Sequence, residues 1–361
     1  MVVKADNFPQ AEFWRGKRVL LTGHTGFKGA WLTIWLERLG AVVHGISLPP
    51  TTSPNLFESA GLAETSVSRF VDIRDAGALS RTIAESDPEI VLHLAAQALV
   101  RPGYSDPAAT FATNTQGTVN VLDALRQVCS PRVVVAITTD KVYRNLEHGL
   151  PYRETDTLGG FDPYSASKAA AELVISAYRS SYFESRGIAL AVGRAGNVIG
   201  GGDWAADRLI PDLIRASNAG AELEIRRPKA VRPWQHVLDP LAGYLKLAEV
   251  LWSDPSLADA YNFGPLTHEA ASVRDVVELA ATAYPVGKID WGDGTEGPHE
   301  ANLLTLEIAK ARQTLGFTPL WSLEEAVLRT MRWFGGFQAG ESARSCCLRD
   351  IDAYEEARSP E

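Results

Sequence analysis

The chain has 361 residues, of which 45% are hydrophobic and 22% are charged, as in an ordinary globular protein with one large α/β unit and an attached lobe. Its net charge of −9 argues against a nucleic-acid partner, because such proteins usually carry a basic face. Cysteines 129, 346 and 347 are too few for a disulfide framework and lack zinc spacing, so we expect no metal site and a reducing cytoplasm. We expect no membrane association, because no run reaches about 18 apolar residues and residues 1–14 lack the apolar core of a signal peptide.

Strands and helices are predicted to alternate along the first half of the chain. Residues 18–22 form a short apolar run that stops at Gly23, which predicts a buried strand. Residues 27–39 then have helical apolar spacing and end at Gly40. Further strands are expected at 42–46, 89–94, 132–138 and 188–193, and further helices at 115–128, at 163–186 and ending at 83–85. This order predicts an α/β fold with a parallel sheet covered on both faces.

The first strand and helix are joined by Gly23-His24-Thr25-Gly26-Phe27-Lys28-Gly29. Glycines let the backbone turn tightly and approach a pyrophosphate, and the helix N-terminus supplies free N–H groups. A simple glycine turn is the alternative, but the strand–turn–helix context favours a dinucleotide fingerprint, although the spacing is GxxGxxG rather than GxGxxG. The fold is therefore predicted to be a Rossmann-type doubly wound sheet. The candidate cofactor-binding residues in this loop are Gly23, Thr25, Gly26, Phe27, Lys28 and Gly29.

The second strand bears on the choice between NAD and NADP. A dinucleotide fold usually places an acid about 20 residues after the loop to bind the adenosine ribose. Residues 44–48 contain no acid, so Ser47 is the candidate for a hydrogen bond to the ribose. No arginine stands beside Ser47 to favour a 2′-phosphate, which favours NAD over NADP. Asp72 and Ile73 fit the place where an acid and a backbone carbonyl flank adenine.

The alternation of elements changes after Gly196. Glycines 200–202 and a basic, proline-containing stretch at 226–233 predict a smaller C-terminal α/β lobe, and residues 261–264 look like one more strand of the main sheet. We therefore expect a dinucleotide-binding domain of residues 13–195 plus about 236–265, a substrate-binding lobe of residues 196–235 plus about 266–340, and a polar, irregular tail of residues 341–361.

Tyr164 and Lys168 form the first candidate catalytic pair. They are four residues apart on a predicted helix, so they lie on one face about 6 Å apart. The ammonium is expected to lower the phenol pKa from about 10, which makes Tyr164 a candidate proton acceptor for a hydroxyl group that is being oxidised. Such spacing occurs by chance in many helices, and the pair gains its meaning from the dinucleotide fingerprint in the same chain.

These motifs, in this order, resemble the extended short-chain dehydrogenase/reductase family over the first 200 residues. The matching segments are the glycine loop, Asp72-Ile73, residues 93–96, Asn114 before Gly117, and Tyr164-xxx-Lys168. The resemblance implies that Leu94, Ala95, Ala96, Asn114, Tyr164 and Lys168 also bind the cofactor, NAD.

Later segments are similar to a narrower group, the nucleotide-sugar 4,6-dehydratases. Residues 196–200, 208–211 and 232–239 match this group, while residues 139–141, 202–208 and 298–302 resemble its branch that acts on CDP-glucose. The resemblance implies a hydro-lyase that forms CDP-4-keto-6-deoxy-D-glucose and water by moving a hydride internally from C4 to C6. It also implies a homodimer or a dimer of dimers, with the helices at 115–128 and 163–186 as candidate dimer face.

The resemblance assigns roles to five residues. Tyr164 would take the proton of the sugar 4-hydroxyl, Lys168 would lower the Tyr164 pKa and bind the nicotinamide ribose, and Thr139 would hydrogen-bond the 4-oxygen. Asp140 would protonate the departing 6-hydroxyl. The dTDP-glucose enzymes carry Asp-Glu where this chain has Asp140-Lys141. Lys141 is therefore a base when neutral, a cation that stabilises the enolate, or merely the partner of a carboxylate.

The predicted substrate-binding residues come from the segment after the cofactor strand and from the later part of the chain. Bidentate arginine suits a diphosphate, with Arg232 as first choice and Arg208 as second. The alternative functions are another nucleotide-sugar 4,6-dehydratase or a 4-epimerase of the same family and, in another class, a non-catalytic NAD(P)-sensing protein. The full set of predicted substrate-binding residues is Gln97, Arg101, Asn197, Arg208, Leu209, Arg232, Gln235 and His299.

Overall fold

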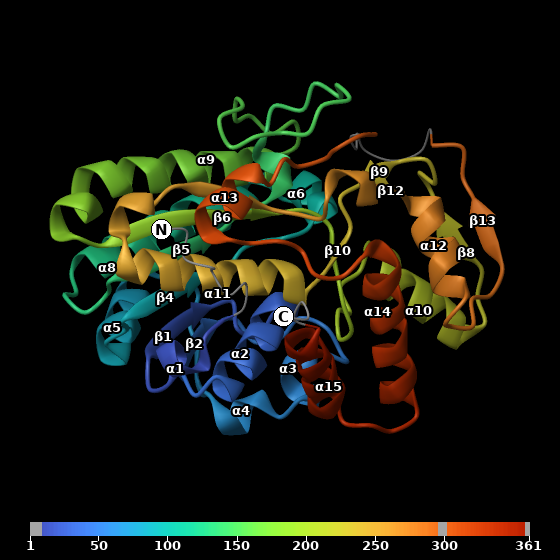
Figure 1. Ribbon diagram of the computed structural model, residues 1–361, viewed down its shortest axis with the longest axis horizontal. Coiled ribbons are helices and arrows are strands. Elements are labelled where there is room, and N and C mark those ends of the chain that lie inside the picture. Colours follow the sequence, from blue (N-terminus) through green and yellow to red (C-terminus); the bar gives the residue numbers. More distant parts are fainter. Residues whose placement is uncertain (1–8, 295–301, 358–361) are drawn as a thin grey trace.

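The computed structural model describes residues 9–294 and 302–357. Its centre is a seven-stranded, all-parallel sheet in the order β11-β6-β5-β4-β1-β2-β3 (Figure 1). The chain builds one half outward from β1 and then crosses back to build the other half from β4, which is the doubly wound topology. The predicted Rossmann-type α/β fold is confirmed. The strands are β1 (Arg18–Thr22), β2 (Val42–Ser47), β3 (Val67–Phe70), β4 (Ile90–His93), β5 (Val133–Ile137), β6 (Ala189–Ala195) and β11 (Ala260–Phe263).

The sheet separates two apolar cores, because successive strand residues point to opposite faces. In β1, Val19 and Leu21 belong to the core on one face, and Leu20 belongs to the core on the other. The first core is closed by α2 (Phe27–Arg38) and α11 (Leu238–Ser253), and the second by α5 (Ala76–Ser86), α8 (Gly117–Arg126) and α9 (Pro163–Tyr178). Shorter helices on the way are α1 (Ala11–Trp14), α3 (Leu56–Ser59), α4 (Leu62–Thr65), α6 (Val100–Ser105), α7 (Pro107–Phe111) and α13 (Ala309–Leu315).

Two predicted helices differ from the observed ones. The helix predicted at 163–186 is α-helical only to Tyr178 and continues as a π-helical turn at Arg179–Phe183 and a 3₁₀ turn at Glu184–Arg186. The helix predicted at 115–128 begins instead with a π-helical turn at Ala112–Gln116 that runs into α8. Such wide turns have no signal in apolar periodicity, which is why the sequence did not indicate them.

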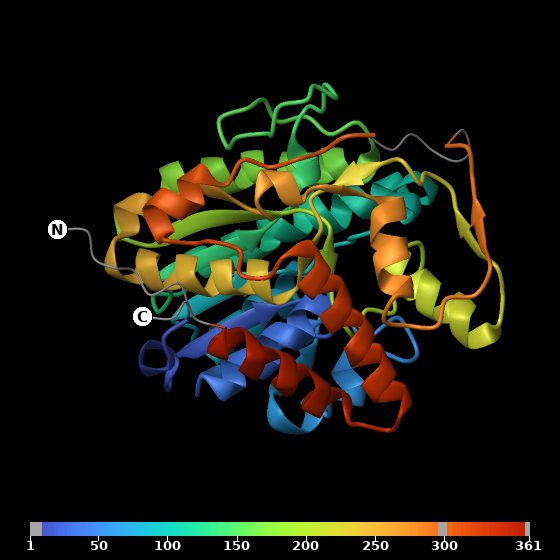
Figure 2. The same cartoon turned by 45° about the vertical axis from the view of Figure 1, so that its right-hand side comes forward.

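The second part of the structure is a small α/β lobe at the right of Figure 1, which comes forward in Figure 2. It contains the helices α10 (Leu209–Ala219) and α12 (Val273–Ala281). Its strands form two pairs: β8 (Leu223–Ile225) with β13 (Ile289–Trp291), and β9 (Val231–Arg232) with β12 (Ala271–Ser272). A further short pair, β7 (Val198–Ile199) with β10 (Gln235–His236), lies outside the lobe, where β10 contacts α11. The predicted domain boundaries stay a prediction.

The C-terminal segment corrects one expectation. The tail predicted to be irregular forms α15 (Ala343–Glu356), which follows α14 (Leu323–Gln338) and lies against α2. Cys346, Cys347, Ile351 and Tyr354 are buried along one face of α15, and the Trp35 indole of α2 donates to Glu355 at 2.9 Å. The many polar residues of this segment concealed a helical apolar spacing.

Among the described residues, no helix is both long and apolar enough to cross a lipid bilayer.

Candidate active site

A cavity of about 1080 Å³ lies at the carboxyl ends of the parallel strands, between the sheet and the small lobe. The loops that follow β1, β4, β5 and β6 line one side of it, and residues 223–227, 230 and 232 of the lobe line the other. The crevice outside the carboxyl ends of the strands is where open α/β sheets bind ligands. This cavity is therefore the candidate active site.

The glycine loop has the tight geometry that a pyrophosphate site needs. Gly23 has a φ of +79°, and a Cβ at Gly29 would lie only 2.1 Å from the Gly23 carbonyl oxygen. A Cβ at Gly23 would lie 2.7 Å from the Ala95 nitrogen, so the loop packs directly on the end of β4. Gly26 is the N-cap of α2 and has no capping side chain, which leaves the first amides of α2 available to an anion. All six loop residues predicted to bind the cofactor line the cavity.

The residues predicted to bind the adenosine half of the cofactor are arranged only partly as expected. Ser47 lines the cavity, but its hydroxyl already lies 2.8 Å from the Thr25 hydroxyl. Asp72 and Ile73 also line the cavity, and Asp72 forms an ion pair with Arg74 at 2.6 Å. Arg74 is a cavity residue that sequence reasoning missed, because it comes from the turn after β3 rather than from the end of β2.

Tyr164 and Lys168 lie in the first turns of α9, both buried, and both line the cavity. Asp162 fixes the start of α9, where its carboxylate accepts from the Ser165 amide at 3.0 Å. The Lys168 ammonium donates to the Ile137 carbonyl at 2.8 Å. Burial lowers the pKa of Lys168 to about 8, against the opposing effect of the Glu172 carboxylate.

The predicted lowering of the Tyr164 pKa is wrong for this structure. Burial raises the pKa of Tyr164 to about 12, and a hydrogen bond with Thr139 offsets only part of that increase. The reason is that the phenol is desolvated, while the Lys168 ammonium points to the Ile137 carbonyl. Tyr164 therefore needs further positive charge in the cavity before it can act as a base near neutral pH.

Asp140 and Lys141 follow β5 and complete the group. Asp140 is fully buried, and its Oδ1 accepts from the Thr139 hydroxyl at 2.9 Å and from the Lys141 ammonium at 3.0 Å. Within the described residues its Oδ2 has no hydrogen-bond partner. A Cβ at Gly196 would lie 2.9 Å from this oxygen, so only glycine leaves it room. The predicted catalytic residues thus meet in one place.

Lys28 reaches further into the site than a phosphate contact requires. Its ammonium lies 5.9 Å from the ring of Tyr244, a residue of α11 that sequence reasoning did not single out. Burial lowers the pKa of Lys28 to about 7, with Arg208, Lys168 and Lys141 adding to the decrease and Asp140 opposing it. Several cations therefore surround one carboxylate in the cavity.

Most of the predicted substrate-binding residues line the cavity. Arg208 is paired with Asp203 at 3.0 Å, and Arg101 is paired with Asp207 of the same loop at 2.9 Å. Gln235 is not among the residues that line the cavity, and its buried amide donates to the Phe263 carbonyl at 2.9 Å, so its role in substrate binding stays a prediction. His299 lies outside the described residues. Those that line the cavity are Gln97, Arg101, Asn197, Arg208, Leu209 and Arg232.

The cofactor-binding residues after β4 divide into two kinds. Leu94, Ala95 and Ala96 line the cavity as predicted. Asn114 is not among the lining residues, and its contact with the cofactor stays a prediction. Its side chain is buried and bonds the Gln97 backbone at 2.8 and 3.0 Å and the Ser167 hydroxyl at 2.9 Å, so it ties the loop after β4 to α9.

The lobe contributes cavity residues that the sequence analysis did not select. Arg226, Arg227 and Glu224 line the cavity together with Arg232. No group of three or more histidine, cysteine, aspartate or glutamate residues in the described part of the chain is arranged to hold a metal ion.

Comparison with known proteins decides the family. Residues 19–264, more than half of the chain, match the NAD dependent epimerase/dehydratase family. The chain belongs to this family. NAD is the cofactor of the family, and the residues of the cavity fit it: the glycine loop leaves no space for a side chain at positions 23 and 29, and the Tyr164–Lys168 pair lies beside it.

The chain is 46% identical over 348 residues to the CDP-glucose 4,6-dehydratase of Salmonella typhimurium, a match that covers 95% of this chain and 97% of that enzyme. Two solved structures share the fold. The dTDP-glucose 4,6-dehydratase of Bacillus anthracis with NAD has a TM-score of 0.72 and 23% identity, covering 90% of this chain and 99% of that one. The UDP-glucose 4-epimerase of Thermotoga maritima has a TM-score of 0.74 and 22% identity, covering 89% and 99%.

Proposed function

We propose that this protein converts CDP-D-glucose to CDP-4-keto-6-deoxy-D-glucose and water with NAD as its cofactor. One observation carries the proposal: a single cavity joins the dinucleotide loop, the Tyr164–Lys168 pair and the Asp140–Lys141 pair. The first pair suits an oxidation at C4, and the second suits an elimination across C5 and C6. The 46% identity to a CDP-glucose 4,6-dehydratase supports the choice of nucleotide and of product.

The cofactor site is built from the loop of residues 23–29 and from Tyr164 and Lys168. The α2 amides face the pyrophosphate in this proposal, and Lys168 binds the nicotinamide ribose. NAD⁺ supplies a hydride acceptor and a positive charge when it is bound. Everything else is done by side chains of this chain.

Tyr164 acts first and removes the proton from the sugar 4-hydroxyl as C4 loses its hydride. Thr139, which hydrogen-bonds the phenol, also bonds the 4-oxygen and so fixes the direction of proton transfer. Lys168 donates to the Ile137 carbonyl, so the positive charge that favours the tyrosinate would come from the bound nicotinamide. The products of this half-reaction are a 4-ketone and a protonated Tyr164.

The ketone makes the C5 proton acidic, and water is then eliminated across C5 and C6. Asp140 protonates the departing 6-hydroxyl, and Lys141, whose ammonium lies 3.0 Å from Asp140, acts at C5 as base or as the cation that stabilises the enolate. The hydride removed from C4 returns to C6, and a proton returns to C5. The sugar therefore loses one molecule of water, and its overall oxidation state does not change.

Substrate anchoring is assigned to the cavity residues that face the lobe. Arg232 and Arg208 bind the diphosphate, since a guanidinium fork matches phosphate oxygens. Asn197, whose amide oxygen lies 3.5 Å from the Lys141 ammonium, positions the sugar. We also propose a homodimer or dimer of dimers through α8 and α9, where Leu173 of α9 is 64% exposed.

The proposal is tested by incubating the protein with CDP-, dTDP-, UDP- and GDP-glucose, without and with added NAD⁺, and analysing the products by NMR. We expect a 4-keto-6-deoxy product from CDP-glucose at the highest kcat/KM. Tyr164→Phe should lose at least a hundredfold in kcat, because it removes the proton acceptor. Formation of CDP-galactose would show a 4-epimerase instead, and unchanged turnover in Tyr164→Phe would contradict the mechanism.

A further inference from the structure

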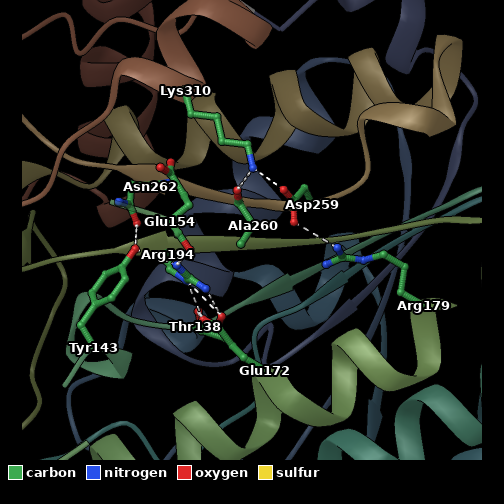
Figure 3. A network of polar contacts seen from close by, with 10 residues as sticks. All are labelled: Thr138, Tyr143, Glu154, Glu172, Arg179, Arg194, Asp259, Ala260, Asn262 and Lys310. Atoms are coloured by element: carbon green, nitrogen blue, oxygen red, sulfur yellow. Dashed lines mark hydrogen bonds and ion pairs between the residues drawn. The ribbon is translucent and has the colours of Figure 1, made fainter. Parts of the chain in front are cut away.

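A buried ion pair lies directly behind the catalytic pair. Glu172 is on α9 one turn beyond Lys168, so Tyr164, Lys168 and Glu172 follow one another along one face of the helix. The Glu172 carboxylate pairs with Arg194 of β6, whose Nε lies 2.9 and 3.0 Å from the two oxygens and whose Nη2 bonds the same group (Figure 3). Both side chains are at most 4% exposed.

The same carboxylate also holds the end of β5. The Thr138 hydroxyl donates to Glu172 at 2.6 Å, and Thr138 directly precedes Thr139 and Asp140 (Figure 3). Lys168 donates to the carbonyl of the residue before Thr138. Helix α9 therefore bonds the end of β5 at two adjacent residues: Lys168 donates to the Ile137 carbonyl, and Glu172 accepts from the Thr138 hydroxyl.

Arg194 extends the network to Tyr143, which also lines the cavity, and from there to β11. Its Nη1 donates to the Tyr143 hydroxyl at 2.7 Å, and the Tyr143 hydroxyl donates to Asn262 of β11 at 2.7 Å (Figure 3). Tyr143 follows Asp140 and Lys141 by only a few residues, so its fixed position also limits movement of the catalytic loop. The carboxylate of Glu172 thus cannot turn away without breaking several buried hydrogen bonds.

The charges around Lys168 show what the carboxylate does. The titratable groups that face the ammonium are Tyr164 and Glu172 from α9, Lys28 from α2 and His93 from β4. Burial lowers the pKa of His93 to about 3, so this imidazole is neutral near pH 7. Lys28 is a basic group and cannot supply a negative charge to Lys168. Glu172 is the group whose charge raises the pKa of Lys168.

We propose that Glu172 is a positioning residue of the active site, which uses its buried bond to Arg194 to keep the Lys168 ammonium charged and to fix the strand end that carries Thr139 and Asp140. A buried ion pair alone contributes little or nothing to stability relative to apolar residues, so a functional role accounts for it better. The effect on turnover rests on the proposed function, whereas the effect on Lys168 does not.

Glu172→Gln tests the proposal, since it removes the charge and keeps the shape. Without the carboxylate the Lys168 pKa falls, so its charge is lost at a lower pH. The pH at which kcat falls on the alkaline side should decrease by about one unit, which corresponds to a roughly tenfold change in the protonation equilibrium of Lys168. The affinity for NAD⁺, measured calorimetrically against pH, should weaken over the same range. Glu172→Asp, which keeps the charge, should restore both profiles towards the wild type.

Asp259→Asn is the matched control, because it makes the same chemical change at an exposed carboxylate that pairs with Arg179 and Lys310 in Figure 3. It should leave both profiles unchanged. If Glu172→Gln does not fold, the double variant Glu172→Gln with Arg194→Met leaves no unpaired buried cation and should show the same shift. A folded variant whose profiles coincide with those of the wild type would overturn the proposal. Wild-type protein that binds NAD⁺ but does not turn over CDP-glucose would contradict the proposed function alone.

Discussion

At the scale of single residues, the site is distinguished by its basic groups. Lys28, Lys141 and Lys168 all line one cavity, and burial gives Lys28 and Lys168 pKa values of about 7 and about 8. Such values place loss of charge near neutral pH, where an amine can exchange protons. The acid that they surround, Asp140, is fully buried. In the proposed elimination, the acid is therefore one carboxyl group, Asp140, that lies among several lysine amines.

Lys141→Ala should separate the two halves of the reaction. The ammonium bonds the same Asp140 oxygen as the Thr139 hydroxyl but is not among the groups that shift the Tyr164 pKa, so removing it should spare the oxidation at C4 and block chemistry at C5. We expect product formation in D₂O, with its deuterium at C5 followed by NMR, to fall by roughly 10²- to 10⁴-fold, the usual contribution of an acid–base group.

Lys288→Ala is the control for that experiment, because it removes a lysine that also pairs with a carboxylate at 3.0 Å but lies on the surface of the lobe. It should react like the wild type. Unchanged exchange of deuterium into C5 in Lys141→Ala would leave the lysine as a simple ion-pair partner of Asp140.

The sequence could indicate residues whose roles follow from local spacing. Tyr164 and Lys168 share a helix face, and the loop glycines share one turn, so both sets were predictable. The contacts of Gln235 and Asn114 were not, because whether a polar side chain faces the cavity or bonds a neighbouring backbone depends on segments far away in the chain, such as Phe263 and Ser167.

At the scale of elements, the C-terminal helix α15 shows how tertiary contacts override a polar composition. Its buried face meets α2 and α14, and the Tyr354 hydroxyl donates to Asp239 of α11 at 2.8 Å. Burial raises the pKa of Asp350 on this face to about 7, with Arg329 opposing, and raises that of Asp239 to about 6. The buried contacts of α15 therefore contain two carboxyl groups, Asp350 of α15 and Asp239 of α11, that favour their neutral form.

This arrangement predicts a definite pH dependence of stability. A carboxyl group whose folded pKa lies above its unfolded value of about 3.9 stabilises the fold at low pH, and that contribution is lost as pH rises through the folded pKa. For Asp350 the window runs from about 4 to about 7. Asp350→Asn should therefore raise the free energy of unfolding at pH 8 by on the order of 2 kcal/mol and have little effect near pH 4.

Urea unfolding at several pH values measures this difference. Asp352→Asn is the control on the same helix, because Asp352 is 47% exposed and pairs with Arg38 at the surface. Its effect should be small and nearly independent of pH between 5 and 8. A destabilised Asp350→Asn at pH 8 would mean that the buried carboxylate is stabilised by its arginines and not penalised by burial.

At the scale of the whole molecule, the sequence predicted the sheet and the presence of a lobe, but not how the segments of the lobe pair. Alternating strands and helices with right-handed crossovers leave few arrangements of a parallel sheet. The lobe instead joins distant segments, as when residues 223–225 pair with 289–291 and residues 231–232 pair with 271–272. Such short pairs carry no periodic signal, and only the folded chain brings their arginines to the cavity.

The placement of these arginines matters because the chain as a whole carries a net charge of −9. An anionic nucleotide sugar is repelled by the molecule at long range but meets Arg226, Arg227 and Arg232 at the lobe wall of the cavity, with Glu224 as the acid among them. The nearby arginines act over a few ångströms, whereas the repulsion by distant charges is screened over a Debye length of about 8 Å at physiological salt. Local attraction therefore outweighs the repulsion once the substrate enters.

Raising the ionic strength from about 10 to about 150 mM should accordingly raise the KM for CDP-glucose by roughly two- to fivefold and change kcat less, because the Debye length shrinks from about 30 to about 8 Å. Steady-state kinetics at saturating NAD⁺ measures both constants. Arg232→Gln should raise KM at low salt and reduce its salt dependence. Arg81→Gln, which removes an exposed arginine of α5 outside the cavity, should leave that dependence unchanged. A KM that falls with added salt would mean that the net negative charge, rather than the arginines of the lobe, governs the approach of the substrate.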